Sequence, residues 1–194
     1  MKLNKLLTFI GTAIITLPTL AQQSPEPNYH FSAAYLVAKS TQEIYAAIGG
    51  WVNSVSYEAY LSRFDSYGET NYHAQRAGAQ ITDYSPYSYS EDLGIFLYAN
   101  QASPQFMRSG LGINYASGWT FNPQHRAMLG IDLMPEFLSA DWNGHAALEY
   151  CAKAYWDYTP VSWVSIKAEY RYGGTVFKTQ EFYRQFLAGV ILRF

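Results

Sequence analysis

The side chains best suited to chemistry are four histidines and one cysteine, namely His30, His73, His125, His145 and Cys151. No two histidines stand in a metal-ligand spacing such as HExxH or HxH, and the chain contains no GxSxG nucleophile elbow. A lone cysteine cannot form an intrachain disulfide, and it more often fills interior space than reacts. The sequence therefore predicts neither a metal centre nor a cofactor.

Two pairs of residues come closest to a catalytic arrangement. His30 and Ser32 are separated by one residue, and His145 and Glu149 lie on the same side of a predicted strand. A histidine beside a serine or a carboxylate can transfer protons, but interior polar residues commonly form such pairs only to satisfy their hydrogen bonds. The sequence favours a protein without enzymatic activity.

Residues 1–21 have the pattern of a secretory signal peptide. Lys2 and Lys5 precede an apolar run from Leu6 to Leu17, and small residues end the segment at Ala21. The run is shorter than the roughly 20 residues that a membrane-spanning helix needs. Cleavage after Ala21 leaves 194 − 21 = 173 residues, with 13 − 2 = 11 basic and 15 acidic side chains, a net charge of −4. This mild acidity gives no indication of nucleic-acid binding.

Strands are the elements predicted to position these residues, because apolar and polar residues alternate through most of the mature chain. Eight strands are expected, near 51–64, 70–82, 93–100, 110–119, 126–134, 145–157, 164–172 and 182–194. Alternately short and long connections are typical of an antiparallel up-and-down meander. Pro135 should cause a bulge or end the pairing, because proline cannot donate a ladder hydrogen bond.

The polar faces of these strands carry charges of both signs, six acids against four bases. The predicted polar network of the lumen comprises these ten residues and one histidine: Glu58, Arg126, Asp132, Glu136, His145, Glu149, Lys153, Asp157, Lys167, Glu169 and Arg171. The interior of an eight-stranded barrel is just wide enough for side chains to fill. Ion pairs among these residues are therefore expected to plug it.

The opposite faces carry aliphatic and aromatic residues and almost no charge. Aromatic residues such as Trp119, Trp156 and Tyr158 lie near strand ends, as is typical of membrane–water interfaces. Strands can cross a membrane when they close into a barrel, because no backbone group is then left unpaired in lipid. The sequence predicts an all-β transmembrane barrel rather than a soluble sandwich.

With its signal peptide, amphipathic strands and terminal Phe194, the chain resembles small Gram-negative outer-membrane β-barrel proteins. The resemblance covers residues from about 51 to 194. It implies export through the periplasm to the outer membrane, contact with outer-membrane lipids and lipopolysaccharide, and a monomeric barrel. It also implies that the barrel-assembly machinery reads an assembly signal in the last strand, at Phe186, Val190, Leu192 and Phe194.

The segment 22–50 allows two interpretations. Ser40 and Glu43 form a capping box, and Gly49 could end a short periplasmic helix over 41–48. Alternatively, two more strands at 29–38 and 43–49 would raise the strand number from eight to ten. The helix with eight strands is slightly favoured.

Three functions remain open at this point. The first is a plugged outer-membrane barrel with a structural or surface-interaction role. The second is a narrow, porin-like channel for small solutes or polymer export. The third is a lipid-modifying enzyme, since some barrels of this class are acyltransferases, deacylases or phospholipases.

Overall fold

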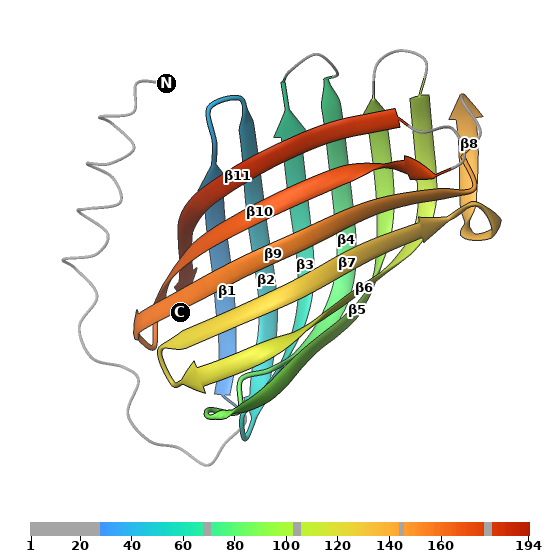
Figure 1. Cartoon of the computed structure of the whole chain (residues 1–194). Helices are drawn as coiled ribbons and strands as arrows, with labels where there is room; N and C mark the ends of the chain where they lie inside the picture. Colours follow the sequence, from blue (N-terminus) through green and yellow to red (C-terminus); the bar gives the residue numbers. More distant parts are fainter. Residues whose placement is uncertain (1–27, 68–70, 103–105, 144–145, 177–179) are drawn as a thin grey trace.

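The alternating segments form strands that join into a single antiparallel sheet (Figure 1). The computed structural model describes residues 28–67, 71–102, 106–143, 146–176 and 180–194. The signal peptide predicted for residues 1–21, and His145, lie outside the described residues. The elements are β1 (Asn28–Val37), β2 (Thr41–Val52), β3 (Val55–Ser66), β4 (Tyr72–Asp83), β5 (Ser88–Ala102), β6 (Phe106–Asn122), β7 (His125–Pro135), η1 (Glu136–Leu138), β8 (Ser139–Asn143), β9 (Leu148–Val161), β10 (Val164–Val176) and β11 (Gln180–Arg193).

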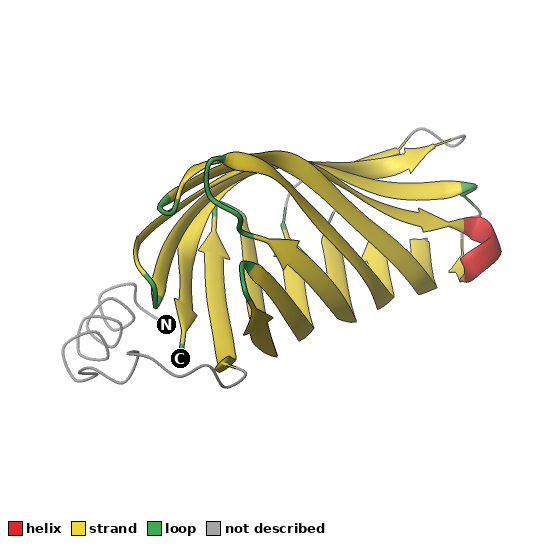
Figure 2. Ribbon diagram, turned by 90° about the horizontal axis from the view of Figure 1, so that it is seen from below, coloured by secondary structure: helices red, strands yellow, loops and turns green. Residues whose placement is uncertain are grey.

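The sheet closes on itself, because β1 pairs with both β2 and β11, and β5 pairs with both β4 and β6. Ten strands surround the lumen, since β8 only continues the position of β7 beside β6. The alternative of ten strands is thus confirmed, and the preferred number of eight is wrong. In Figures 1 and 2, β7, β9, β10 and β11 form one wall of the barrel, which crosses the wall made by β1 to β4.

The short helix predicted over 41–48 is also wrong, because this segment lies within β2. Every residue of β2 is paired with β3, and residues 42–51 are also paired with β1. Along β2, Ala47 is buried towards the interior while Ile44 and Ile48 are exposed outside. A helix here would leave the edges of β1 and β3 unpaired in lipid, a cost that one capping box cannot offset.

Pro135 ends β7, as its missing N–H predicts. The single 3₁₀ turn η1 follows, and the chain then rejoins β6 as β8. Among the described residues, no helix is long and apolar enough to cross a membrane.

A second irregularity lies between β10 and β11. The register shifts at Gly173 and Gly174, which pair with Tyr183 and Glu181, so Phe182 is the extra residue of a bulge. Strict alternation along 182–194 predicts that Phe182 shares the outer face with Phe186. In the structure both Phe182 and Tyr183 are buried. Gly173 permits this packing, because a Cβ there would lie 2.2 Å from the Tyr183 ring.

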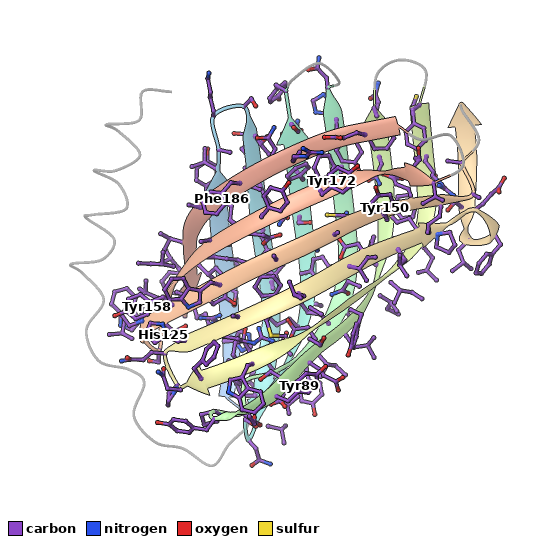
Figure 3. The ribbon with its side chains drawn as sticks, in the orientation of Figure 1. Tyr89, His125, Tyr150, Tyr158, Tyr172 and Phe186 are labelled. Atoms are coloured by element: carbon purple, nitrogen blue, oxygen red, sulfur yellow. The ribbon has the colours of Figure 1, made fainter. Side chains whose placement is uncertain are left out.

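The outer surface of the barrel is apolar between two bands of aromatic side chains (Figure 3). His125 stacks on Tyr158 and Trp156, with ring centroids 4.8 and 5.6 Å away. Tyr150 and Tyr172 pack together near the opposite end, at 5.9 Å. Exposed aliphatic residues fill the band between, among them Ile48, Leu61, Ile95, Leu97, Leu129 and Ile166. This is the surface that lipid tails require.

Candidate functional site: the lumen

The lumen has two distinct ends. One of them is the terminus end, where short turns link β2 to β3, β4 to β5, β6 to β7 and β9 to β10. Both ends of the described chain lie there too, since the Phe31 and Phe194 backbones exchange hydrogen bonds of 2.8 and 2.9 Å. The remaining connections lie at the opposite, loop end.

Asp132 forms one ion-pair centre in the middle of the lumen. It comes from β7 and pairs with Lys153 on the neighbouring β9, at 2.7 Å from Nζ to Oδ1. It also pairs with Arg76, which reaches across from β4. The guanidinium of Arg76 lies over the Phe96 ring, 4.7 Å from its centroid. Because β4 and β7 are not neighbours, this group ties two walls together.

Glu169 forms a second centre on β10. It accepts a hydrogen bond from Arg171 Nε, and Lys167 Nζ lies 3.2 Å from its Oε2. Arg171 Nη2 extends to Glu43 Oε2 on β2 at 2.5 Å. Lys167 also lies over the Tyr155 ring, 4.0 Å from the centroid. Two cations and two carboxylates therefore neutralise one another between β2 and β10.

Glu58 gathers donors from three strands. His30 Nε2 lies 2.8 Å from Oε1, while Tyr45 and Gln80 donate to Oε2 at 2.7 and 2.9 Å. The Ser32 hydroxyl also donates to Oε1, at 3.3 Å. His30 and Ser32 thus share one acceptor, whereas an activated serine needs its hydroxyl bonded to the imidazole. What this arrangement does is fix a buried carboxylate.

Tyr84, which belongs to the turn between β4 and β5, lies at the terminus end of the lumen. Its ring packs on Trp51 at 5.0 Å, and the Arg126 and Arg193 guanidinium groups lie 4.8 and 5.7 Å from its centroid. Its backbone N–H donates to Ser54 O at 2.9 Å, which anchors this turn to the preceding one. Arg126 from β7 and Arg193 from β11 therefore hold one side chain across the opening.

Arg126 links Tyr84 to two carboxylates of the lumen. It pairs with Asp92 on β5, and its Nη1 lies 3.9 Å from Asp157 Oδ2 on β9. The Tyr155 hydroxyl donates to the same Asp92 at 2.6 Å.

The loop end is filled by an aromatic cluster of Phe64, Tyr72, Phe106, Phe182 and Tyr183. None of these side chains is more than 6% exposed. The Tyr183 ring contacts Phe64 and Tyr72 at 4.8 Å each, and Phe182 contacts Phe106 at 4.9 Å. The members come from β3, β4, β6 and β11, so the cluster spans the lumen.

Glu149 lies beside this aromatic cluster and joins it to the far wall. Its Oε1 accepts hydrogen bonds from Tyr72 at 2.7 Å and Asn100 at 2.9 Å. Cys151, on the same strand, is buried among the apolar members of the cluster. Its surroundings are those of a residue that fills space.

Between Tyr84 and the aromatic cluster lies a polar cavity of about 150 Å³. Six acids and six bases line it, namely Glu43, Glu58, Asp92, Asp132, Asp157, Glu169, Arg76, Arg126, Lys153, Lys167, Arg171 and Arg193. Their formal charges cancel, so the lining has no excess charge of one sign that would favour anions or cations.

Nine residues of the predicted network face this interior, namely Glu58, Arg126, Asp132, Glu149, Lys153, Asp157, Lys167, Glu169 and Arg171. Glu136 requires a correction: it is exposed on η1, because the chain leaves the sheet at Pro135 and its alternation ends there. His145 lies outside the described residues.

Among the described residues, sequence reasoning missed Glu43, Arg76, Asp92 and Arg193, which line the cavity, and also the buried Arg108. Alternation could have found Asp92 and Arg193, which stand next to the outward Leu93 and Leu192. Glu43 was hidden by the predicted helix. The described residues contain no group of three or more His, Cys, Asp or Glu that could hold a metal ion.

No protein-family model and no curated protein matches this sequence. The closed sheet with its apolar outer face and polar interior is the architecture of a membrane-spanning barrel. The chain resembles outer-membrane β-barrel proteins. This confirms the resemblance predicted from the sequence, and nothing indicates a narrower family.

Solved structures that match this barrel include OmpT, an outer membrane protein of Vibrio cholerae, at 10% identity and a TM-score of 0.38, covering 84% of this chain and 64% of that chain. Neisserial surface protein A matches at 14% identity and a TM-score of 0.35, covering 86% and 96%. The NanC porin matches at 10% identity and a TM-score of 0.38, covering 85% and 98%. The barrel thus spans less than two thirds of the length of the Vibrio cholerae protein.

Proposed function

We propose that this chain is an outer-membrane barrel with a closed lumen and a structural or surface-interaction role. The observation that carries the proposal is the set of side chains that packs at each end of the lumen. Tyr84 crosses the terminus end, and the aromatic cluster fills the loop end. Between them, balanced ion pairs join opposite walls, and we propose that they leave an ion no continuous path through the cavity.

The location in the outer membrane is supported by the apolar outer face and by the signal peptide predicted for residues 1–21. In the proposed orientation the terminus end faces the periplasm and the loop end faces outside. Short turns on one side and longer connections on the other are the usual asymmetry of such barrels.

Conductance across a planar lipid bilayer tests the closed lumen. The mature chain, from residue 22 onward, is refolded in detergent, and heat-modifiable gel mobility confirms that the barrel has formed. We expect folded protein to insert without discrete current steps. Steady steps of uniform size would overturn the closed lumen and establish the narrow channel, whose path would lead through the polar cavity.

A further inference from the structure

The outer face of the barrel carries a polar cluster near the loop end of β2, β3 and β4. Its centre is Asp65, which is only 3% exposed although it points away from the lumen. Asp65 accepts hydrogen bonds from Arg63 Nε at 2.9 Å and Gln42 Nε2 at 3.4 Å, and His73 Nδ1 lies 2.8 Å from its other oxygen. Three side chains therefore satisfy this carboxylate and are oriented by it.

Arg63 presents the free part of its guanidinium group to the surroundings. Its side chain is 59% exposed, and the ion pair with Asp65 uses Nε alone. Nη1 and Nη2 have no partner among the described residues. A guanidinium held in this way offers a two-pronged donor that matches the oxygen atoms of a phosphate group.

An apolar hollow begins directly below Arg63, towards the middle of the membrane. In the sheet, Ile44 and Gln75 flank Arg63, and the next outward row is Ala46, Leu61, Ala77 and Leu97. The small alanines stand between large aliphatic side chains, which leaves a groove whose wall includes Arg63, Gln75 and Ala99. Polar donors at the rim and hydrocarbon below match a lipid with its headgroup at the membrane surface.

We propose that this surface binds one phosphorylated lipid, with a phosphate on Arg63 and an acyl chain in the hollow. The proposal rests on the orientation given above, in which the loop end lies in the outer leaflet. The phosphorylated lipid of that leaflet is lipid A, and we commit to it as the occupant. Gln75 and His73 lie beside Arg63 and can add hydrogen bonds to the headgroup.

Arg184 on β11 provides a matched control. Its side chain is also 59% exposed and lies near the loop end, where it pairs with Glu181 at 3.3 Å. Its guanidinium lies over Tyr172, 5.4 Å from the ring centroid. The outward neighbours there are bulky, including Tyr170 and Phe186, in place of the alanines beside Arg63.

Native mass spectrometry of the refolded mature chain in detergent measures the binding. The probes are bis-phosphorylated lipid A, the same lipid A after dephosphorylation, and phosphatidylglycerol. We expect one lipid A per barrel, and Arg63→Gln should weaken it about tenfold, the size of one lost charge-assisted contact, whereas Arg184→Gln should not. Dephosphorylation should weaken binding to the wild type by a similar factor and cause no further loss in Arg63→Gln.

Equal weakening by Arg63→Gln and Arg184→Gln, or no effect of dephosphorylation, would overturn the phosphate site. Phosphatidylglycerol bound as tightly as lipid A would overturn the choice of lipid A.

Should Arg63→Gln not refold, Ala77→Phe fills the hollow without touching the polar cluster, and Ala168→Phe on β10 is its control. Ala77→Phe alone should weaken binding, and equal binding by the two variants would also refute the site. Conductance is measured separately, so failure here is distinct from failure of the closed lumen.

Discussion

Individual charged residues in the lumen act in groups that cross the barrel. Asp132 holds Lys153 and Arg76, while Glu169 holds Lys167 and Arg171. Removing one member of such a group leaves buried charge without its partner, which costs more than the pair itself contributes. Ordinary surface pairs have no comparable effect, because water replaces the missing partner.

Glu169→Ala should therefore destabilise the barrel strongly. The substitution leaves Lys167 and Arg171 buried with less negative charge, at a cost of about 3–5 kcal/mol. Glu136→Ala, at the exposed position on η1, is the control and should change little. The measurement is the free energy of unfolding in denaturant for protein refolded in detergent. Equal free energies of unfolding for the two variants would contradict the assignment of Glu169 to a buried ion-pair group.

At the scale of elements, the seam between β1 and β11 is where the ends of the chain close the barrel. Phe194 exchanges two backbone hydrogen bonds with Phe31 there, and their rings stack at 6.4 Å. Phe186 and Phe194 point outwards, and Val190 and Leu192 continue the same row of β11. The assembly signal proposed for these four residues therefore lies on the outer surface, where another protein can reach it before the seam closes.

Substitution of Phe194 separates assembly from stability. We expect Phe194→Ala to refold in detergent, because its backbone still pairs with Phe31, and to accumulate poorly as a folded barrel in cells. Heat-modifiable gel mobility of both preparations measures this, with Phe121→Ala as the control, since Phe121 is an equally exposed aromatic outside the last strand. Equal accumulation in cells would remove Phe194 from the signal, and failure of both preparations would assign it to the seam instead.

For the whole molecule, the closed lumen that we propose has two closures in series. Tyr84 obstructs the terminus end, and Phe64 and Tyr183 are central to the aromatic cluster at the loop end. An open path requires that both be removed, because the resistance of one closed end is enough to stop ion flow.

Conductance of combined variants tests this arrangement. Tyr84→Ala alone and Phe64→Ala with Tyr183→Ala should each give folded barrels without current steps, whereas the triple variant should give small, uniform steps. The outward Tyr89→Ala serves as the control. Current from either partial variant would mean that the other closure does not seal, and a silent triple variant would assign the seal to the central ion pairs.

The strands of the second half of the barrel, and most of the charges on their inner faces, were predictable from sequence. Residues such as Glu149, Lys153 and Glu169 follow the period of two, and the period of a strand decides which face a side chain occupies. The same rule failed at Phe182 and Glu136. At both places a bulge or a break shifts the phase, and local sequence does not state which residue is left unpaired.

The class of this protein is readable from its amino-acid sequence, because lipid outside and charge inside require alternating strands that close into a barrel. The number of strands follows from tertiary pairing. Residues 41–48 suit a helix locally, but they form a strand because the backbone groups of β1 and β3 need hydrogen-bond partners. The tertiary structure alone decided which charges meet, because Arg76 and Asp132, or Arg171 and Glu43, are distant in sequence and adjacent only across the lumen. The contacts of Tyr84 with Trp51, Arg126 and Arg193 likewise join three separate elements that no local pattern connects.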